Sequence, residues 1–201
     1  MSTHSFIQTE LAESLAHYQA IVNDNALHSA ISQVAEACTA CLQNGGTVFF
    51  AGNGGSAADA QHLAAELAGR MNYDRPGLAG IALTANSSNL TAIGNDYGFD
   101  TVYSRQLAGI GKKGDVFIGI STSGNSVNIV KAMETARDKD MTTISMTGAN
   151  LCQMDALADI ALKMPSTRTP KIQEGHIAIG HIVMGLIEIA IFPQQQQAQA
   201  A

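Results

Sequence analysis

The spacing of apolar residues changes about one fifth of the way along the chain. From Ser5 to Gln43, apolar residues recur every three or four positions, as at Leu27, Ile31 and Val34. This spacing predicts two helices, and the sequence Asn44-Gly45-Gly46 predicts the end of the second. Beyond this point, short apolar runs alternate with Gly- and Ser-rich turns and helical stretches.

Five short apolar runs predict five strands. They are Thr47–Ala51, Gly80–Leu83, Val116–Ile120, Thr142–Met146 and Ile160–Met164. Several are apolar at consecutive positions, which is typical of strands covered on both faces. Strands that alternate with helices predict a parallel sheet in a three-layer α/β domain.

The end of the chain predicts one long helix and a tail. The helix is expected from about Ile172 to Ile191, and the Gln- and Ala-rich residues 193–201 are expected to be disordered. We therefore expect a single domain over residues 1–192, which includes the N-terminal helical pair at about 5–43.

Composition adds an expectation of self-association. The 201 residues are 46% hydrophobic and 14% charged, whereas charged residues usually make up about 25% of a soluble chain. So little charge leaves apolar surface that a partner must cover, and a second copy of the chain is the simplest partner.

Charge and cysteine usage exclude several classes of protein. Lys and Arg total 11 against 17 Asp and Glu, and this net charge of −6 argues against nucleic acid and membrane-surface partners. We find no apolar run of about 18 residues and no signal-peptide pattern at the N-terminus. Three cysteines, an odd number, favour a reducing cytoplasm over a disulfide framework.

Two turns carry the first candidate chemistry. Ala51–Ser56 and Ser121–Ser126 each follow a predicted strand and precede a predicted helix. Carboxyl ends of parallel strands meet at one edge of the sheet, where backbone N–H groups, hydroxyls and helix N-termini suit a phosphate monoester. Neither turn fits a Walker or G-x-G-x-x-G pattern, so nucleotide binding is disfavoured. The alternative is that the turns merely join strands to helices.

Two helices carry candidate ligands. His62 and Glu66 lie at i and i+4 on one helix face and could converge on a metal ion or a substrate, although a surface pair is the alternative. Gln173 and His181 lie eight residues apart on roughly one side of the last helix. A lone His on an apolar helix is often a hydrogen-bonded core residue, and spacing alone does not bring the two helices together.

Cys38 and Cys41 form a C-x-x-C sequence, which occurs in redox and zinc sites. Here the sequence lies within a predicted helix, without a preceding strand or a second cysteine pair. Two small core residues are the favoured interpretation.

These segments together resemble the sugar isomerase (SIS) domain family and, within it, the phosphoheptose isomerases. The likeness runs from the first helix to the last. The matching motifs are Gly52-Asn-Gly-Gly-Ser56, Asp59-Ala-Gln-His-Leu-Ala-Ala-Glu66, Gly94-Asn-Asp96, Ile120-Ser-Thr-Ser-Gly-Asn-Ser126 and Ile172-Gln-Glu-x-His-Ile-x-x-x-His181.

The resemblance implies a flavodoxin-like, five-stranded parallel sheet and a homotetramer with active sites between subunits. It also implies conversion of sedoheptulose 7-phosphate to D-glycero-D-manno-heptose 7-phosphate, the first step of bacterial lipopolysaccharide heptose synthesis. We expect the N-terminal helices and the stretch from His176 to Ile191 to form the interface.

The resemblance also implies roles for individual residues. Glu66 and His181 match the catalytic acid/base pair. The zinc ligands, for one ion per subunit, are His62, Glu66, Gln173 and His181. The phosphate cradle is Ser121, Thr122, Ser123 and Ser126, and further substrate contacts are Asn53, Gly54, Gly55, Ser56, Glu66, Asn95, Asp96 and Gln173.

Two features limit the resemblance. A carboxylate that binds zinc tightly is a weaker base, so Glu66 either moves between the two roles or acts mainly as a base beside a loosely held metal. Several phosphoheptose isomerases have Asp-Arg where this chain has Pro170-Lys171, so a carboxylate that is often assigned to substrate handling is missing here.

Three other functions stay open. A non-catalytic SIS protein that binds a replication initiator is disfavoured, because such proteins lack counterparts of Glu66 and His181. An isomerase of another sugar phosphate fits the sequence as well. A sugar-phosphate-sensing regulator is disfavoured, because no DNA-binding segment precedes the SIS domain.

Overall fold

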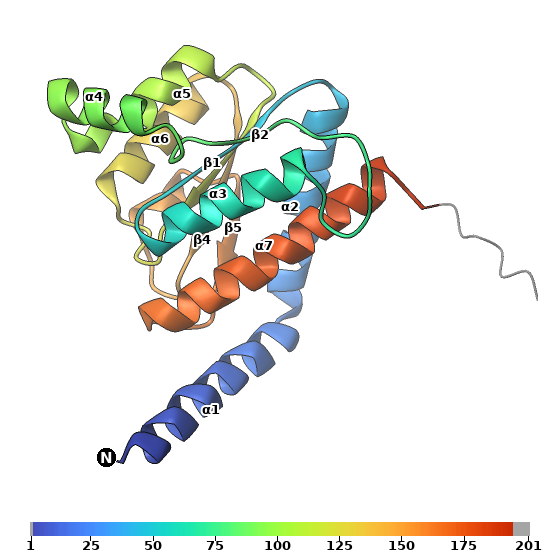
Figure 1. Cartoon of the computed structure of the whole chain (residues 1–201), viewed down its shortest axis with the longest axis vertical. Helices are drawn as coiled ribbons and strands as arrows, with labels where there is room; N and C mark the ends of the chain where they lie inside the picture. The colour runs from blue at the N-terminus through green and yellow to red at the C-terminus, as the bar shows by residue number, and fades with distance from the viewer. Residues whose placement is uncertain (1, 195–201) are drawn as a thin grey trace, which may run out of the picture.

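A computed structural model describes residues 2–194 as a three-layer α/β fold (Figure 1). Five parallel strands form the middle layer in the order β2-β1-β3-β4-β5. The strands are β1 Val48–Gly52, β2 Gly80–Ala82, β3 Val116–Ile120, β4 Thr142–Thr147 and β5 Ile160–Lys163. The helices are α1 Thr3–Val22, α2 Asn25–Gln43, α3 Gly55–Ala68, α4 Ser87–Tyr97, α5 Ser104–Ile110, α6 Val127–Asp138 and α7 Thr169–Ile191. The fold class predicted from the sequence is confirmed.

Alternate residues of the central strands build two cores. Val48 and Phe50 of β1 point to the face covered by α2, α3 and α7, whereas Phe49 and Ala51 point to the face covered by α5 and α6. Because successive side chains of a strand point to opposite faces, a strand between two helical layers is apolar throughout. All five residues of β1 and of β3 are buried.

The start of α7 differs from the prediction by three residues. The helix begins at Thr169, and Pro170 occupies its first turn, where the missing N–H and fixed φ of proline suit a helix start. Because apolar periodicity begins only at Ile172, the pattern alone places the start too late.

By length and composition alone, α7 could cross a membrane. This differs from the expectation that the chain has no such run, because the charged residues of α7 lie near its ends. Ile172, Ile179, Val183 and Ile187 are buried in the core beside the sheet. We therefore interpret α7 as a core helix of the α/β fold.

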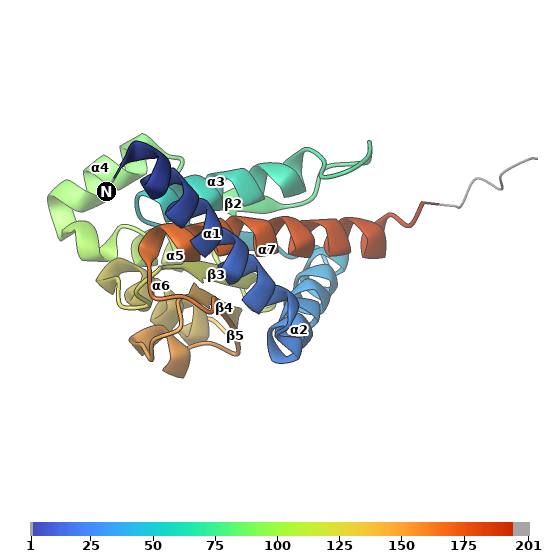
Figure 2. The ribbon, with the colours of Figure 1, turned by 90° about the horizontal axis from the view of Figure 1, so that it is seen from below.

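Figure 1 shows α1 below the three layers, and Figure 2, the view from below, shows it crossing in front of α7. It lies against α7, where the Tyr18 hydroxyl donates a hydrogen bond to the carbonyl of Glu174. Its apolar residues Leu11 and Leu15 are 66% and 71% exposed. An exposed apolar helix face of this kind is typical of a surface that a partner covers.

The two cysteines of the C-x-x-C sequence lie on the buried face of α2. Cys38 is fully buried, and burial raises the pKa of the Cys41 thiol to about 11. Both thiols are therefore protonated at neutral pH and pack as small apolar groups. The prediction that they are core residues agrees with this geometry.

Of the tail expected over residues 193–201, the part from residue 195 onward lies outside the described residues.

Buried His176 on α7 gives a prediction about stability. Its Nε2 lies 3.2 Å from the carbonyl oxygen of Thr147, and burial lowers the pKa of the imidazole to about 4. The unfolded imidazole has a pKa of about 6.5, so between pH 6.5 and 4 the unfolded chain binds more protons than the folded chain. The free energy of unfolding therefore decreases as the pH is lowered through this range. Between pH 7.5 and pH 5 we expect a loss of about 2 kcal/mol in the free energy of unfolding.

Urea unfolding at fixed protein concentration measures this loss. In the His176→Gln variant, the difference between pH 7.5 and pH 5 should shrink by most of that amount. An equal difference in wild type and variant would show that His176 does not control the acid sensitivity.

Candidate active site

The first turn, between β1 and α3, is shaped by glycine. A Cβ on Gly52 would lie 2.3 Å from the carbonyl oxygen of Ser56, so a larger residue cannot fit. Gly54 has φ +57° and ψ −120°, a conformation that side chains strongly disfavour. The chain can therefore turn sharply from the strand into α3 and present backbone N–H groups at the edge of the sheet.

Asn53 connects the two candidate turns. Its side-chain amide and that of Asn128 on α6 exchange two hydrogen bonds of 2.8 and 2.9 Å. Asn128 is 3% exposed, and the sequence motifs do not include it. The available signal was a polar residue between the apolar Val127 and Ile129, at the start of a helix that follows a candidate phosphate turn.

The second turn, between β3 and α6, is held by serine hydroxyls. The Ser121 hydroxyl accepts a hydrogen bond from the N–H of Gly124 and lies 2.9 Å from the Ser126 hydroxyl oxygen. Thr122 and Ser123 line a cavity of about 150 Å³. The other residues that line it are neutral: Gly148, Ala149, Asn150, Ser166, Thr167, Thr169 and Ile172.

Gln173 of α7 lies at the first turn. A Cβ added to Gly55 would lie 2.4 Å from Nε2 of Gln173, so the two residues are in close contact. The N-terminal ends of α3 and α7 therefore meet at the edge of the sheet where both candidate turns lie. This places Gln173 beside Gly54, Gly55 and Ser56.

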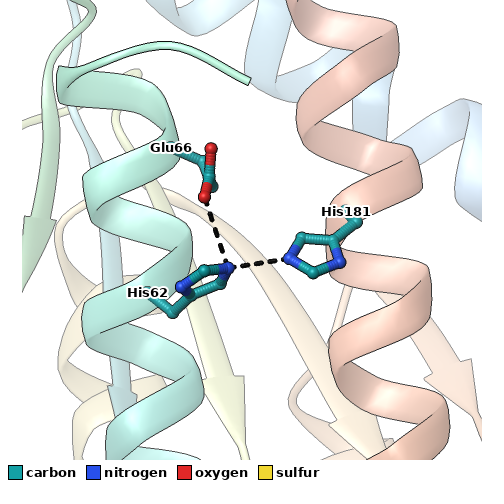
Figure 3. Close-up of side chains that lie close together, drawn as sticks. All are labelled: His62, Glu66 and His181. Atoms are coloured by element: carbon teal, nitrogen blue, oxygen red, sulfur yellow. Dashed lines mark hydrogen bonds and ion pairs between the residues drawn. The ribbon is translucent and has the colours of Figure 1, made fainter. Parts of the chain in front are cut away.

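Three candidate ligands face one another between α3 and α7 (Figure 3). Nε2 of His62 lies 2.7 Å from Nε2 of His181 and 3.3 Å from Oε1 of Glu66. One ligand atom from each residue lies within 4.8 Å of the others. The convergence follows from the packing of α3 beside α7, which brings together residues 119 positions apart.

This cluster has the chemistry of a metal site. In a hydrogen bond between two imidazole Nε2 atoms, one nitrogen donates and the other accepts. Two imidazole nitrogens and a carboxylate oxygen form a ligand set used by catalytic zinc sites, which keep a further position open. The His62 side chain is 47% exposed, so a small ligand can reach the cluster.

Gln173, the fourth expected ligand, contacts the first turn within one chain. Eight residues of α-helix separate Gln173 from His181, a rise of about 12 Å. Its amide contacts Gly55, which precedes His62 by seven residues on α3. Three of the four ligands expected from the resemblance thus have ligand atoms within 4.8 Å of one another, and the role of Gln173 as the fourth stays a prediction.

Asn95 and Asp96 also lie apart from the cluster. They are exposed on α4, where the Asn95 amide donates a 2.8 Å hydrogen bond to the Asp96 carboxylate. The apolar side of α4 packs with α5 and α6 on the opposite face of the sheet from α3 and α7.

Asp59 is a further polar residue near the cluster. It precedes His62 by three positions on α3, and its Oδ2 is buried without a hydrogen-bond partner within residues 2–194. Burial raises the pKa of its carboxyl group, and the nearby His62 opposes this shift. Its spacing of one helical turn from His62 was the signal in the sequence.

Lys171, where the chain departs from the family pattern, points toward α1. Its ammonium group donates hydrogen bonds to Ser14, to the carbonyl of Glu10 and to the carboxylate of Glu174. The side chain is 6% exposed. Lys171 therefore joins α1 to α7 and does not offer its charge to the cavity.

Comparison with known proteins identifies the family. Residues 12–148 match the model of the SIS domain. The chain is 50% identical over 191 residues to the phosphoheptose isomerase of Burkholderia pseudomallei (strain 1710b). These residues make up 95% of this chain and 97% of that protein. The chain belongs to the phosphoheptose isomerase family of SIS domain proteins.

Solved phosphoheptose isomerases share the fold. The enzyme from Neisseria gonorrhoeae is 43% identical with a TM-score of 0.87, covering 93% of this chain and 99% of that chain. The enzyme from Francisella tularensis is 37% identical with a TM-score of 0.89, covering 93% of this chain and 98% of that chain. The resemblance stated from the motifs is therefore confirmed over nearly the whole length of phosphoheptose isomerases.

Proposed function

We propose that this protein is an aldose-ketose isomerase that converts sedoheptulose 7-phosphate to D-glycero-D-manno-heptose 7-phosphate, the entry to bacterial heptose synthesis. The observation that carries the proposal is the convergence of His62, Glu66 and His181 in a chain 50% identical to a phosphoheptose isomerase. A non-catalytic SIS protein would not need these three groups on facing helices.

The reaction defines what the residues must do. Interconversion of a ketose and an aldose moves a proton between adjacent carbons through an enediol, so it needs a base near carbon and an acid near oxygen. We assign the base to the carboxylate of Glu66 and the acid to the imidazole of His181. His62 lies 2.7 Å from His181 and 3.3 Å from Glu66, so it can hold both groups in place.

A zinc ion, one per subunit, fits the same three residues. When bound, it would polarise the sugar carbonyl and stabilise negative charge on oxygen as a Lewis acid. Nitrogen atoms of His62 and His181 and the carboxylate of Glu66 would hold it. Because a carboxylate bound to zinc is a weaker base, we expect Glu66 to exchange between ligand and base or to hold the metal loosely.

The phosphate end of the substrate is assigned to the two turns. Hydroxyls of Ser121, Thr122, Ser123 and Ser126 can donate hydrogen bonds to phosphate oxygens, and the N-terminus of α6 adds a favourable dipole. Asn53, Gly54, Gly55 and Ser56 offer amide groups from the neighbouring turn. Thr122 and Ser123 also line the neutral cavity of about 150 Å³, which fits the assignment of this turn to the phosphate end.

Gln173, Asn95 and Asp96 complete the site from a neighbouring subunit in this proposal. Each lies away from the His62 cluster of its own chain. A homotetramer would cover the exposed apolar face of α1 and bring these residues to the cluster of another copy. The single SIS domain, over residues 1–192, is proposed to work in the cytoplasm, where reduced Cys38, Cys41 and Cys152 are stable.

Mixed oligomers test the contribution of Gln173 from a partner. We expect Gln173→Ala and Glu66→Gln to be nearly inactive separately, and co-expressed chains with different tags to recover a measurable fraction of wild-type kcat. Recovery arises because some sites then take Glu66 from one chain and Gln173 from another. If the co-purified mixed oligomer stays as inactive as the single variants, both residues act within one chain.

A substrate panel tests the proposed function. Purified protein with added zinc is incubated with sedoheptulose 7-phosphate, fructose 6-phosphate or ribulose 5-phosphate, and the aldose product is measured by NMR. We expect the highest kcat/KM for sedoheptulose 7-phosphate. A higher kcat/KM for another sugar phosphate would show that sedoheptulose 7-phosphate is not the preferred substrate, and the protein would still be an aldose-ketose isomerase.

A further inference from the structure

A buried ion pair lies beyond the His62 cluster, where the segment after α3 crosses α7. Nε of Arg75 lies 3.2 Å from Oε1 of Glu188, and the two side chains are 2% and 0% exposed. Burial of two charges is unfavourable unless hydrogen bonds satisfy both groups. Both Arg75 and Glu188 make further hydrogen bonds that satisfy their charges.

The Glu188 carboxylate holds the segment after α3 against α7. It accepts hydrogen bonds of 2.8 Å from the N–H of Met71 and 2.7 Å from the N–H of Asn72, in addition to the one from Arg75. Three donors from one short segment thus converge on a single side chain of α7.

The Arg75 guanidinium holds the end of α3. It donates hydrogen bonds of 2.7 Å to the carbonyl of Glu66 and 2.6 Å to the carbonyl of Leu67. The last four carbonyls of a helix have no partner within the helix, so a cation that binds them fixes the final turn. That turn carries Glu66, and Arg75 thereby connects its backbone to Glu188.

Glu188 shares a helix face with His181. Seven residues of α-helix turn by about 700°, so Glu188 lies within about 20° of the direction of His181, two turns further along α7. Closer to the cluster, a Cβ on Gly180 would lie 2.7 Å from the Leu63 side chain, which shows how closely α3 and α7 approach. The two helices are thus in contact beside His181 and joined by the ion pair two turns beyond it.

We propose that Arg75 and Glu188 are positioning residues for the isomerase, which fix the turn carrying Glu66 relative to His181. This inference rests on the proposed function. Neither residue belongs to the His62 cluster, so both act through the backbone of α3 and the placement of α7. A displacement of about 1 Å at reacting groups can lower a rate by about a hundredfold, so such a link affects turnover more than substrate binding.

Two variants test this connection between the end of α3 and α7. A lysine can keep a positive charge near Glu188, but it lacks the planar fork that reaches the carbonyls of Glu66 and Leu67. Glu188→Gln keeps the shape and removes the charge. For both variants we expect kcat with sedoheptulose 7-phosphate to fall at least about tenfold with KM within about threefold, because a misplaced base slows the chemical step.

Zinc affinity provides a second readout. Competition with a chromogenic chelator should show weaker binding, by at least about tenfold, in Arg75→Lys and Glu188→Gln, because the ligands from α3 and α7 are no longer held together. Leu107→Ala is the matched control, since Leu107 is fully buried in the core on the opposite face of the sheet. It should lower the melting temperature and leave kcat and zinc affinity near those of wild type.

The outcomes separate the two proposals. If folded Arg75→Lys and Glu188→Gln keep kcat and zinc affinity within twofold of wild type, or change no more than Leu107→Ala, the positioning role is wrong. If wild-type protein binds zinc but turns over no sugar phosphate, the proposed function fails, and the zinc affinities of the variants still decide whether the ion pair positions the cluster.

Discussion

Glu66→Gln should lower kcat for sedoheptulose 7-phosphate about a thousandfold, since general base catalysis contributes about 10²- to 10⁴-fold. Glutamine has nearly the same shape as glutamate but accepts no proton from carbon at neutral pH. Initial rates at saturating substrate measure the effect, and KM should change much less than kcat.

Two controls make the Glu66 result specific. Glu134→Gln, at an exposed position of α6, removes one carboxylate elsewhere and should leave kcat unchanged. The zinc content of Glu66→Gln shows whether the loss comes from the base or from the metal. Near-normal turnover by Glu66→Gln would remove the base assignment.

The double variant Ser121→Ala/Ser126→Ala should lower kcat/KM about a hundredfold or more, mainly through KM. Each hydroxyl is expected to donate a hydrogen bond to a doubly charged phosphate, and hydrogen bonds to charged groups contribute about 1.5–3 kcal/mol each. The change also removes one of the two acceptors of the Gly124 N–H, which then keeps only the carbonyl oxygen of Ser121, and this loosens the turn. Steady-state kinetics over a wide range of substrate concentration measures both constants.

The phosphate assignment has its own control. Ser32→Ala, on the exposed side of α2, should leave kcat/KM unchanged. Inorganic phosphate should inhibit wild type competitively and inhibit the double variant only weakly. Equal inhibition of the two proteins would place the phosphate elsewhere.

Much of the fold could be predicted from the sequence because burial on both faces makes the strands apolar throughout. Every predicted run corresponds to a strand, and β3 matches its run residue for residue. The apolar pattern places the start of α7 three residues late, because Thr169 and Pro170 carry no apolar periodicity. Conformational preference, rather than hydrophobic pattern, determines that boundary.

The candidate site was only partly predictable. The spacing of His62 and Glu66 indicates one helix face, but their approach to His181 depends on packing between segments 119 residues apart. The Arg75–Glu188 pair spans 113 residues and the Asn53–Asn128 pair spans 75. Such pairs leave no local pattern, because each partner alone resembles an ordinary surface residue in the sequence.

The low charge of the chain has a structural counterpart in α1. Leu11 and Leu15 are exposed in the single chain, as expected for a helix face that packs against another copy. The separation of Gln173 from His181 gives the same expectation from the site itself. The homotetramer stays a prediction, and light scattering that shows a monomer would contradict it.

The most direct test of the isomerase assignment is ¹H NMR of purified protein with sedoheptulose 7-phosphate in D₂O, with and without zinc. The account predicts the signals of an aldose 7-phosphate that carries deuterium at C2, since the proton passes through a base in contact with solvent. An unchanged sedoheptulose 7-phosphate spectrum under both conditions, with folded protein present, would contradict it.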